Sequence, residues 1–235
     1  MKPEKKAREM SLEEWASYID YSVLKPEFTP DEIVYYCKKG VELKVAQVCI
    51  SPGYMKLCEP IVRGTNTKLG PTCDFPFGNS STESKVRQAK LALQSDCVGE
   101  LDMVANFGLI RAGLYDEVSR DIEAVANVCH EKGIECKVII ETGALNEEQI
   151  RKACHAVVKG KADWIKTSTG FLTGYDDHGA TCQIIQMMME EVGNQIKIKG
   201  SGHIRTQEHF LELIDMGIDR MGIGYKSVPV VLGLE

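Results

Sequence analysis

The sequence predicts an α/β fold, a single (β/α)8 TIM barrel over residues 1–235 with an extra N-terminal helix. Strand-like and helical segments alternate along the chain without a low-complexity linker. The strand-like segments are apolar on both faces, which is typical of parallel strands covered by helices. Eight such units in 235 residues favour a closed barrel. An open, doubly wound sheet is the second interpretation.

The helix starts are recognisable from their caps. The extra helix begins at the capping box Ser11-Leu12-Glu13-Glu14. A second helix begins at Thr29-Pro30, with acidic residues in its first turn, and we expect it to stop at Gly40. Further helices are expected after Pro52 and at 81–94, 116–132, 146–160, 181–192 and 207–216. The strands are expected at 18–23, 45–50, 68–75, 99–105, 136–141, 163–166, 196–200 and 219–223.

The composition argues against several classes of partner. The formal net charge is −6, and Lys and Arg cluster only at 2–8, so neither nucleic acid nor an anionic membrane is expected to bind. No apolar run approaches the roughly 20 residues of a membrane span, and the first residues are charged where a signal peptide needs an apolar core. Nine cysteines show no Cys-x-x-Cys pair and no zinc-site spacing. We therefore expect a soluble, cytoplasmic protein with reduced thiols and no metal site.

In such a barrel the catalytic groups stand at the carboxyl ends of the strands. The polar residues that we assign to these ends are Asp20, Ser22, Cys49, Asp74, Asp102, Asn106, Glu141, Lys166, Lys199 and Arg220, together with Gly222 and Gly224. Two lysines and an aspartate would then converge on one barrel mouth. Glu141 is expected in a supporting shell of ion pairs, and Asp74 would add negative charge to the mouth if it points inward.

Lys166 is the most unusual of these residues, because it ends a buried strand and a Thr-Ser-Thr-Gly loop follows it directly. At pH 7 a lysine with a pKa near 10.4 is a free amine only about once in 2,500, so an amine catalyst needs its pKa lowered by roughly three units. Burial and a second ammonium can lower it, and a carboxylate such as Asp102 can then carry protons between carbinolamine, imine and enamine. The alternatives are a lysine that reaches water or pairs with a carboxylate, and a structural aspartate.

Sequence blocks that are typical of one enzyme family stand in that family's order at 19–26, 48–52, 75–78, 100–108, 137–143, 165–171 and 179–181. By these blocks the chain resembles the deoxyribose-phosphate aldolase family, which joins acetaldehyde to glyceraldehyde 3-phosphate through an enzyme-bound imine. The resemblance implies a lyase in which Lys166 forms the imine, Lys199 lowers the pKa of Lys166, and Asp102 runs the proton relay. It also implies that Cys49 lines the pocket, that Ser22 and Thr167 hold hydroxyl groups or water, and that no metal or organic cofactor is needed. A homodimer is a further expectation from the family.

The departures from the family lie where it holds phosphate. Here Lys199 is followed by Gly-Ser-Gly-His-Ile-Arg, so His203 stands at a usual glycine, and the last strand is followed by Tyr225-Lys226-Ser227. The substrate-binding residues expected from this comparison are Asp20, Ser22, Cys49, Thr167, Gly170, Gly202, His203, Arg205, Gly222, Gly224 and Tyr225. Since a side chain at a former glycine replaces part of an amide nest, the sequence predicts a weakened preference for phosphorylated sugar.

Three other functions remain open from the sequence alone. The same imine chemistry could act on an unphosphorylated or differently charged aldol. A non-catalytic sugar-binding barrel would bind ligand without forming an imine. A nicotinamide-dependent oxidoreductase is suggested by Gly200-Ser201-Gly202, but the third glycine of the dinucleotide fingerprint is missing.

Overall fold

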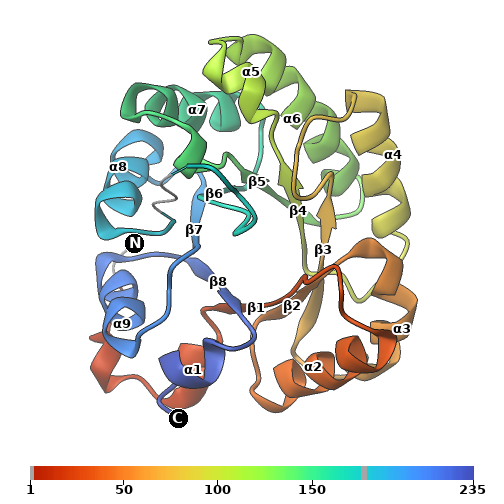
Figure 1. Ribbon diagram of the computed structural model, residues 1–235, viewed down its shortest axis with the longest axis vertical. Coiled ribbons are helices and arrows are strands. Elements are labelled where there is room, and N and C mark those ends of the chain that lie inside the picture. The colour runs from red at the N-terminus through yellow and green to blue at the C-terminus, as the bar shows by residue number, and fades with distance from the viewer. Residues whose placement is uncertain (1–2, 176–178) are drawn as a thin grey trace.

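The protein forms a closed barrel of eight parallel strands in sequence order, β1 to β8, in a computed structural model that describes residues 3–175 and 179–235. The ring of strands lies at the centre and the helices lie outside it (Figure 1). The strands are β1 (Ile19–Val23), β2 (Gln47–Ile50), β3 (Lys68–Cys73), β4 (Glu100–Val104), β5 (Glu135–Ile139), β6 (Trp164–Lys166), β7 (Lys197–Ser201) and β8 (Arg220–Gly224). The barrel closes where β8 pairs with β1, Tyr21 standing opposite Ile223. The predicted fold class is confirmed.

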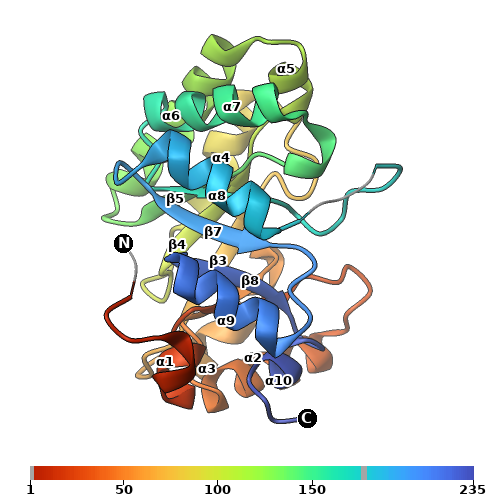
Figure 2. The ribbon, with the colours of Figure 1, turned by 90° about the vertical axis from the view of Figure 1, so that its left-hand side faces the viewer.

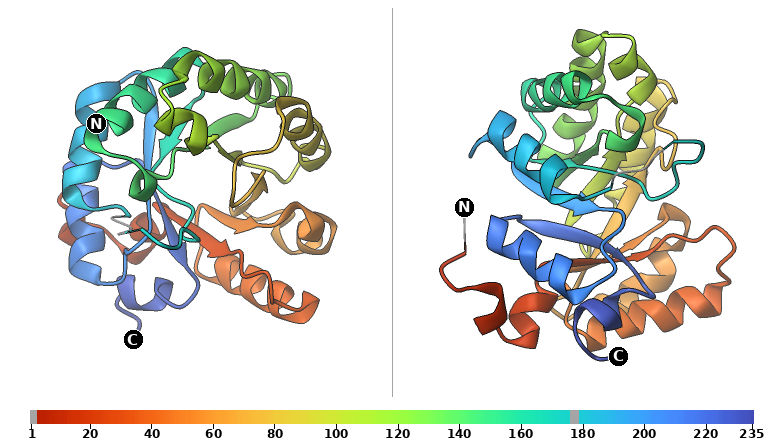
Figure 3. Two further views of the ribbon diagram at one scale, coloured as in Figure 1. Left: turned by 45° about the horizontal axis from the view of Figure 1, so that its top comes forward. Right: turned by 60° about the vertical axis from the view of Figure 1, so that its left-hand side comes forward.

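The helices wrap the outside of the barrel, as two further views show (Figure 3). They are α2 (Pro30–Glu42), α3 (Met55–Val62), α4 (Thr82–Ala92), α5 (Phe107–Arg111), α6 (Tyr115–His130), α7 (Glu147–Lys159), α8 (Cys182–Val192), α9 (Gln207–Met216) and α10 (Val228–Val231). Short 3-10 turns, η2 (Pro52–Tyr54) and η3 (Thr142–Ala144), follow β2 and β5. No helix in the described ranges is both long and apolar enough to cross a bilayer.

The extra N-terminal segment consists of the 3-10 turn η1 (Ala7–Glu9) and the helix α1 (Leu12–Ala16). Its predicted capping box is present, because Ser11 accepts from the Glu14 N–H and Glu14 accepts from the Ser11 N–H. The segment lies beside α9 and is anchored by the buried Ala7, whose N–H donates to Asp215 at 2.8 Å (Figure 2). The Trp15 indole donates back to the Ala7 carbonyl at 2.7 Å. The helix therefore covers one side of the barrel.

Two short helices were not predicted, and the predicted end of α2 is wrong. The unpredicted helices are α5, which Asn106 caps by accepting from the Leu109 N–H, and α10 near the C-terminus. The expected stop of α2 at Gly40 is wrong, because the helix continues to Glu42. Gly40 instead allows a close approach to the barrel, since a Cβ there would lie 2.5 Å from Val48 Cγ2 of β2. A glycine near the end of a helix marks close packing here and not termination.

The strands alternate between an apolar outer face and a polar inner face. Tyr21, Val48 and Ile165 belong to the hydrophobic core between barrel and helices. Their strand neighbours Asp20 and Lys166 are buried among other charged groups in the barrel interior. Side chains of successive strand residues point to opposite faces. The prediction that the strands are apolar on both faces is therefore wrong for the interior, which holds the site.

We expect Gly40→Ala to lower the free energy of unfolding by about 1–3 kcal/mol, because overpacking against the stiff Val48 side chain outweighs the helix propensity gained over glycine. Urea denaturation measures the change. Gly53→Ala is the matched control, since a Cβ there meets no atom within 4 Å. Equal stability of the Gly40→Ala variant and the wild type would contradict the close-packing role of Gly40.

Candidate active site

The centre of the barrel holds two lysines that share one carboxylate. Lys166 ends β6, Lys199 is in β7 and Asp102 is in β4. Oδ2 of Asp102 accepts from Lys166 Nζ at 2.8 Å and from Lys199 Nζ at 2.7 Å. Lys166 stands opposite Lys199 in the register of the two strands, so both side chains enter the interior at one level. All three side chains are buried. The structure thus brings together the three residues that the sequence predicts as catalytic.

A second layer of ion pairs supports this centre from below. Asp20 Oδ2 lies 2.6 Å from Lys199 Nζ, and Asp20 Oδ1 accepts from Arg220 at 2.7 Å. Lys137 donates to Asp20 at 3.2 Å and to Glu100 at 2.9 Å. Because each charged group has an opposite charge in contact, these side chains can be buried without an uncompensated charge.

The surroundings shift the two lysine pKa values in opposite directions. Burial lowers the pKa of Lys166, Asp102 offsets part of that shift, and Lys199 lowers it further. For Lys199, burial would lower the pKa, but Asp102 and Asp20 outweigh it and raise the pKa well above its usual value. Burial would raise the pKa of Asp102, yet Lys166, Lys199 and Lys137 hold it below its usual range. Lys166 is thus the lysine that can lose its proton, while the ammonium of Lys199 and the carboxylate of Asp102 beside it are held in their charged forms at neutral pH.

A pocket of about 420 Å³ opens above these charges at the carboxyl ends of the strands. Lys166 is at its inner end, and Ser22 and Ser201 lie on its walls. The predicted substrate-binding residues that line it are Ser22, Gly170, Gly202, His203, Arg205, Gly222, Gly224 and Tyr225. The site therefore combines a buried amine with an open, polar mouth, which is the arrangement expected for a small-molecule substrate.

Three predicted substrate-binding residues are not among the described residues that line the pocket. Asp20 lies in the ion-pair layer, bonded to Lys199 and Arg220. Cys49 is buried with Sγ 3.7 Å from Lys199 Nζ, and burial raises the pKa of its thiol to about 11. Thr167 donates to the Ser201 carbonyl at 2.8 Å and accepts from the Ser201 N–H, so its hydroxyl joins two strand ends. Direct substrate contact by these three side chains does not fit this geometry.

Three residues assigned to the mouth also have other positions. Asp74 turns toward Ser80, whose hydroxyl donates at 2.6 Å, so its charge does not enter the pocket. Arg220 is the first residue of β8 and lies at the amino end of the barrel. Glu141 follows β5 in a left-handed conformation and accepts from the Thr169 N–H at 3.2 Å, which holds the loop after Lys166.

The sequence reasoning missed several residues of the site. Lys25 adds positive charge to the pocket wall beside Lys226, and Phe171 also lines the pocket. Lys25 also lies 5.6 Å from the centre of the Phe171 ring. Lys137 is fully buried beneath the pocket. A lysine in the middle of an apolar strand segment, as in Cys136-Lys137-Val138, is the signal that could have identified it.

Comparison with known proteins gives a family for this arrangement. Residues 17–227 match the family described as "DeoC/LacD family aldolase". The chain belongs to the DeoC/LacD family of aldolases. A protein of Thermococcus gammatolerans named deoxyribose-phosphate aldolase is 42% identical over 220 residues, which cover 93% of this chain and 95% of that protein. The family membership makes this protein an aldolase, hence a lyase, as the sequence predicts.

Solved structures of aldolases share the fold. A structure titled "QR15, an Aldolase" is 32% identical with a TM-score of 0.84, covering 93% of this chain and 95% of that one. A deoxyribose-phosphate aldolase of Aeropyrum pernix, whose title describes a unique tetrameric structure, has a TM-score of 0.84 at 23% identity, with 95% and 91% covered. At that identity the likeness shows the barrel alone.

We expect Lys137→Met to lower the free energy of unfolding by about 3–5 kcal/mol, because it removes the ammonium that Asp20 and Glu100 share and leaves the buried layer with an unbalanced negative charge. Guanidinium denaturation followed by circular dichroism measures the loss. Lys132→Met, at an exposed lysine on the turn after α6, is the control and should unfold like the wild type. A Lys137→Met variant as stable as this control would show that the second layer does not depend on Lys137.

Proposed function

We propose that this protein is a class I aldolase that reversibly cleaves 2-deoxy-D-ribose 5-phosphate to acetaldehyde and D-glyceraldehyde 3-phosphate. The observation that carries the proposal is the buried pair of lysines on one carboxylate at the end of an open pocket. Relatives that are 42% and 41% identical over more than nine tenths of the chain are named deoxyribose-phosphate aldolase. Family and geometry support the same chemistry.

In this mechanism Lys166 Nζ attacks the aldehyde carbon of the open-chain sugar, and loss of water from the carbinolamine gives the imine. The imine withdraws electrons, so the bond between C2 and C3 breaks when the proton leaves the C3 hydroxyl. Glyceraldehyde 3-phosphate departs and an enamine of acetaldehyde stays on Lys166. Protonation of the enamine carbon and hydrolysis of the resulting imine release acetaldehyde and restore the amine.

Asp102 is suited to carry the protons of these steps. Its Oδ2 is held by the two lysines, whereas Oδ1 accepts no hydrogen bond from the described residues and lies 3.7 Å from Lys137 Nζ. Oδ1 is therefore the oxygen that can bind a proton-carrying water. Lys199 stays charged and keeps the Lys166 amine available. The imine supplies the electron sink, so this chemistry needs no Lewis acid.

The charged end of the substrate is placed at the pocket wall. Lys25, Arg205 and Lys226 line the pocket with positive charge. Gly202 and His203 both have positive φ, 85° and 60°, so a turn that usually requires glycine forms here with histidine. Tyr225 packs against Tyr36 and Phe28, with ring centres 4.5 and 5.1 Å away, and this fixes its position at the wall. The named relatives favour a phosphorylated substrate over the unphosphorylated alternative.

The proposal also covers the cellular compartment and the oligomeric state of the enzyme. All nine cysteines lie in the described ranges and are free thiols, as expected for a reducing compartment, so we place the enzyme in the cytoplasm. A homodimer remains a prediction from the family, which light scattering of the purified protein tests.

Lys166 should be the covalent nucleophile. Incubation with acetaldehyde followed by borohydride should leave an ethyl group on the peptide that contains Lys166, because a reducible imine forms there. Peptide mass spectrometry locates the label, and Lys166→Arg is the control that should stay unlabelled. Recovery of the label mainly on Lys199 would reverse the roles of the two lysines.

Lys199→Met should move the acidic limb of the pH profile of kcat/KM to higher pH. The ammonium of Lys199 lowers the pKa of Lys166, so its removal raises that pKa and less free amine is present at neutral pH. Part of the lost activity should return as the pH rises. Lys197→Met, two residues earlier on β7, is the matched control with an unshifted profile.

Asp102→Asn distinguishes proton transfer by Asp102 from the control of the Lys166 pKa by Lys199. This variant should lose activity, and a rise in pH should not restore it. An unshifted profile for Lys199→Met would remove Lys199 from the control of the Lys166 pKa.

The wild type should prefer 2-deoxyribose 5-phosphate to 2-deoxyribose in kcat/KM, and Arg205→Met should reduce that preference by about tenfold, the effect of losing one hydrogen bond to a charged group. The same assay on His203→Gly tests whether the histidine weakens phosphate binding, as the sequence suggests. If it does, the preference rises in this variant. If the wild type had equal kcat/KM for both sugars, the proposed phosphorylated substrate would be wrong and the unphosphorylated aldol would be favoured.

A further inference from the structure

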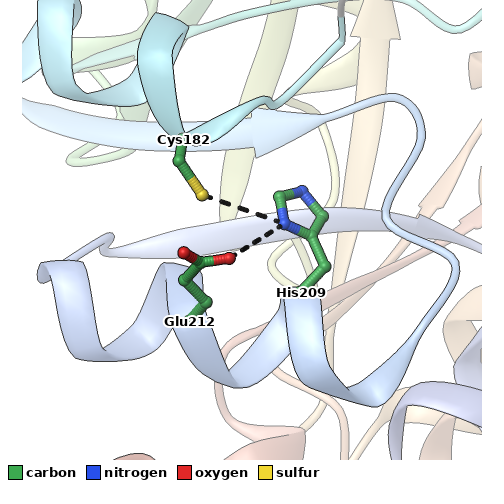
Figure 4. Close-up of side chains that lie close together, drawn as sticks. All are labelled: Cys182, His209 and Glu212. Carbon is green, nitrogen blue, oxygen red and sulfur yellow. Dashed lines mark hydrogen bonds and ion pairs between the residues drawn. The ribbon is translucent and has the colours of Figure 1, made fainter.

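Cys182, His209 and Glu212 form a cluster outside the pocket, near the amino ends of two neighbouring helices (Figure 4). Cys182 is the first residue of α8, while His209 and Glu212 lie on α9. Sγ of Cys182 is 4.0 Å from His209 Nδ1, and Oε2 of Glu212 is 3.9 Å from the same nitrogen. The three donor atoms thus converge on one point between the helices.

The orientation of His209 is fixed by its other ring nitrogen. Nε2 lies 2.9 Å from the Ala180 carbonyl oxygen. A carbonyl only accepts, so Nε2 carries the proton, and in the neutral ring the lone pair is then on Nδ1. That lone pair faces Cys182 and Glu212. A histidine that donates one N–H to a backbone carbonyl and presents the other nitrogen to a thiol and a carboxylate has the arrangement of a metal ligand.

Cys182 also differs from the other cysteines of the protein. It is the only one of the nine that is not buried. The exposed fraction of the Glu212 side chain is 62%, so its carboxylate can rotate toward the other two donors. Solvent therefore reaches the cluster, and an ion has a path to it.

We propose that Cys182, His209 and Glu212 bind a divalent ion of the zinc class, with water as the fourth ligand. One thiolate, one imidazole and one carboxylate are the donors that zinc accepts, and three protein ligands with a water form a tetrahedral site. Bond lengths of about 2.0–2.3 Å place neighbouring donors roughly 3.3–3.6 Å apart. The two separations from His209 Nδ1 need to contract by about half an ångström, and the donors of Cys182 and Glu212, which lie within 4.8 Å of each other, must also approach. Rotation of the exposed Glu212 side chain and a small shift of Cys182 can provide this.

A second group of possible ligands in the barrel differs in one decisive respect. Asp20, Cys49 and Asp102 also lie close together, but Lys199 Nζ is 2.6 and 2.7 Å from the two carboxylates. An ammonium thus takes the place that a cation would occupy. At the cluster of Cys182, His209 and Glu212 no described lysine or arginine forms an ion pair with Glu212. The charge balance there favours an added cation.

The ion would join α8 to α9, two helices that lie side by side on the outside of the barrel (Figure 2). The Ala180 carbonyl that orients His209 belongs to the residue whose N–H donates to the Gly202 carbonyl at 3.1 Å. Gly202 lines the pocket. The proposed site therefore braces the chain behind one pocket wall, apart from Lys166, and the inference does not rest on the proposed function.

Titration of the chelator-treated, full-length protein with zinc chloride tests the proposal. Competition with a chromogenic zinc chelator should give one ion bound per chain. Cobalt chloride in place of zinc should produce a thiolate-to-cobalt charge-transfer band, which reports a cysteine ligand independently of activity. Zinc should also raise the Tm, because an ion that binds only the folded state stabilises it.

Cys182→Ser and His209→Gln should each raise the zinc Kd by at least about 100-fold, since losing a direct ligand exceeds the 10- to 100-fold effect of an outer partner. Glu212→Gln should weaken binding too and, because its side chain is exposed, should fold like the wild type. His155→Gln, at an exposed histidine on α7, is the matched control with unchanged affinity. Wild-type protein without stoichiometric zinc binding, a cobalt complex without the charge-transfer band, or unchanged affinity in Cys182→Ser would each overturn the proposal.

Discussion

The site depends on one carboxylate oxygen that two lysines share. Oδ2 of Asp102 is within 2.8 Å of both Lys166 and Lys199, in a buried place where an unpaired charge would be costly. One negative charge cannot fully balance two ammonium groups, so one lysine is driven toward its neutral form. Asp20 lies 2.6 Å from Lys199 Nζ and stabilises the charge on that lysine, whereas burial lowers the pKa of Lys166, so Lys166 is the one that loses the proton. The asymmetry of the two lysines comes from Asp20.

This asymmetry explains why the barrel interior is polar. The second layer, with Lys137, Glu100 and Arg220, balances Asp20, so that Asp20 can stay charged and hold Lys199. Trp164 closes this layer, with Lys137 and Arg220 5.0 and 5.4 Å from its ring. Cation–π contacts of this kind add to the stabilisation of buried cations. The protein fills its centre with a connected set of charges in place of branched apolar side chains, and the stability of the barrel and the chemistry of Lys166 depend on the same contacts.

The sequence was sufficient to predict the barrel and the three central residues, because helix caps, strand patterns and a buried lysine are local signals. It was not sufficient for side-chain direction. Asp20 and Ser22 share a face of β1, yet one points into the ion layer and the other lines the pocket, since they differ in depth along the barrel axis. Arg220 was assigned to the mouth together with the glycines of its strand, although it stands near the start of the strand predicted at 219–223 and therefore at the amino end of the barrel. Depth within the barrel depends on strand register, which a single sequence does not contain.

The cluster of Cys182, His209 and Glu212 was invisible for a related reason. Cys182 and His209 lie 27 residues apart on two helices, so no short spacing marks the pair, and the absence of a zinc motif said nothing about this surface.

The inner end and the wall of the pocket differ in how far their side chains depend on partners inside the fold. Its inner end consists of buried, mutually paired charges that tolerate little change, whereas Lys25, Arg205 and Lys226 at the wall are exposed and need no partner inside the fold. Residues such as His203 can therefore change at the wall while the imine chemistry beneath stays intact, because among the described residues Asp102 pairs with Lys137, Lys166 and Lys199 and not with the cations of the wall.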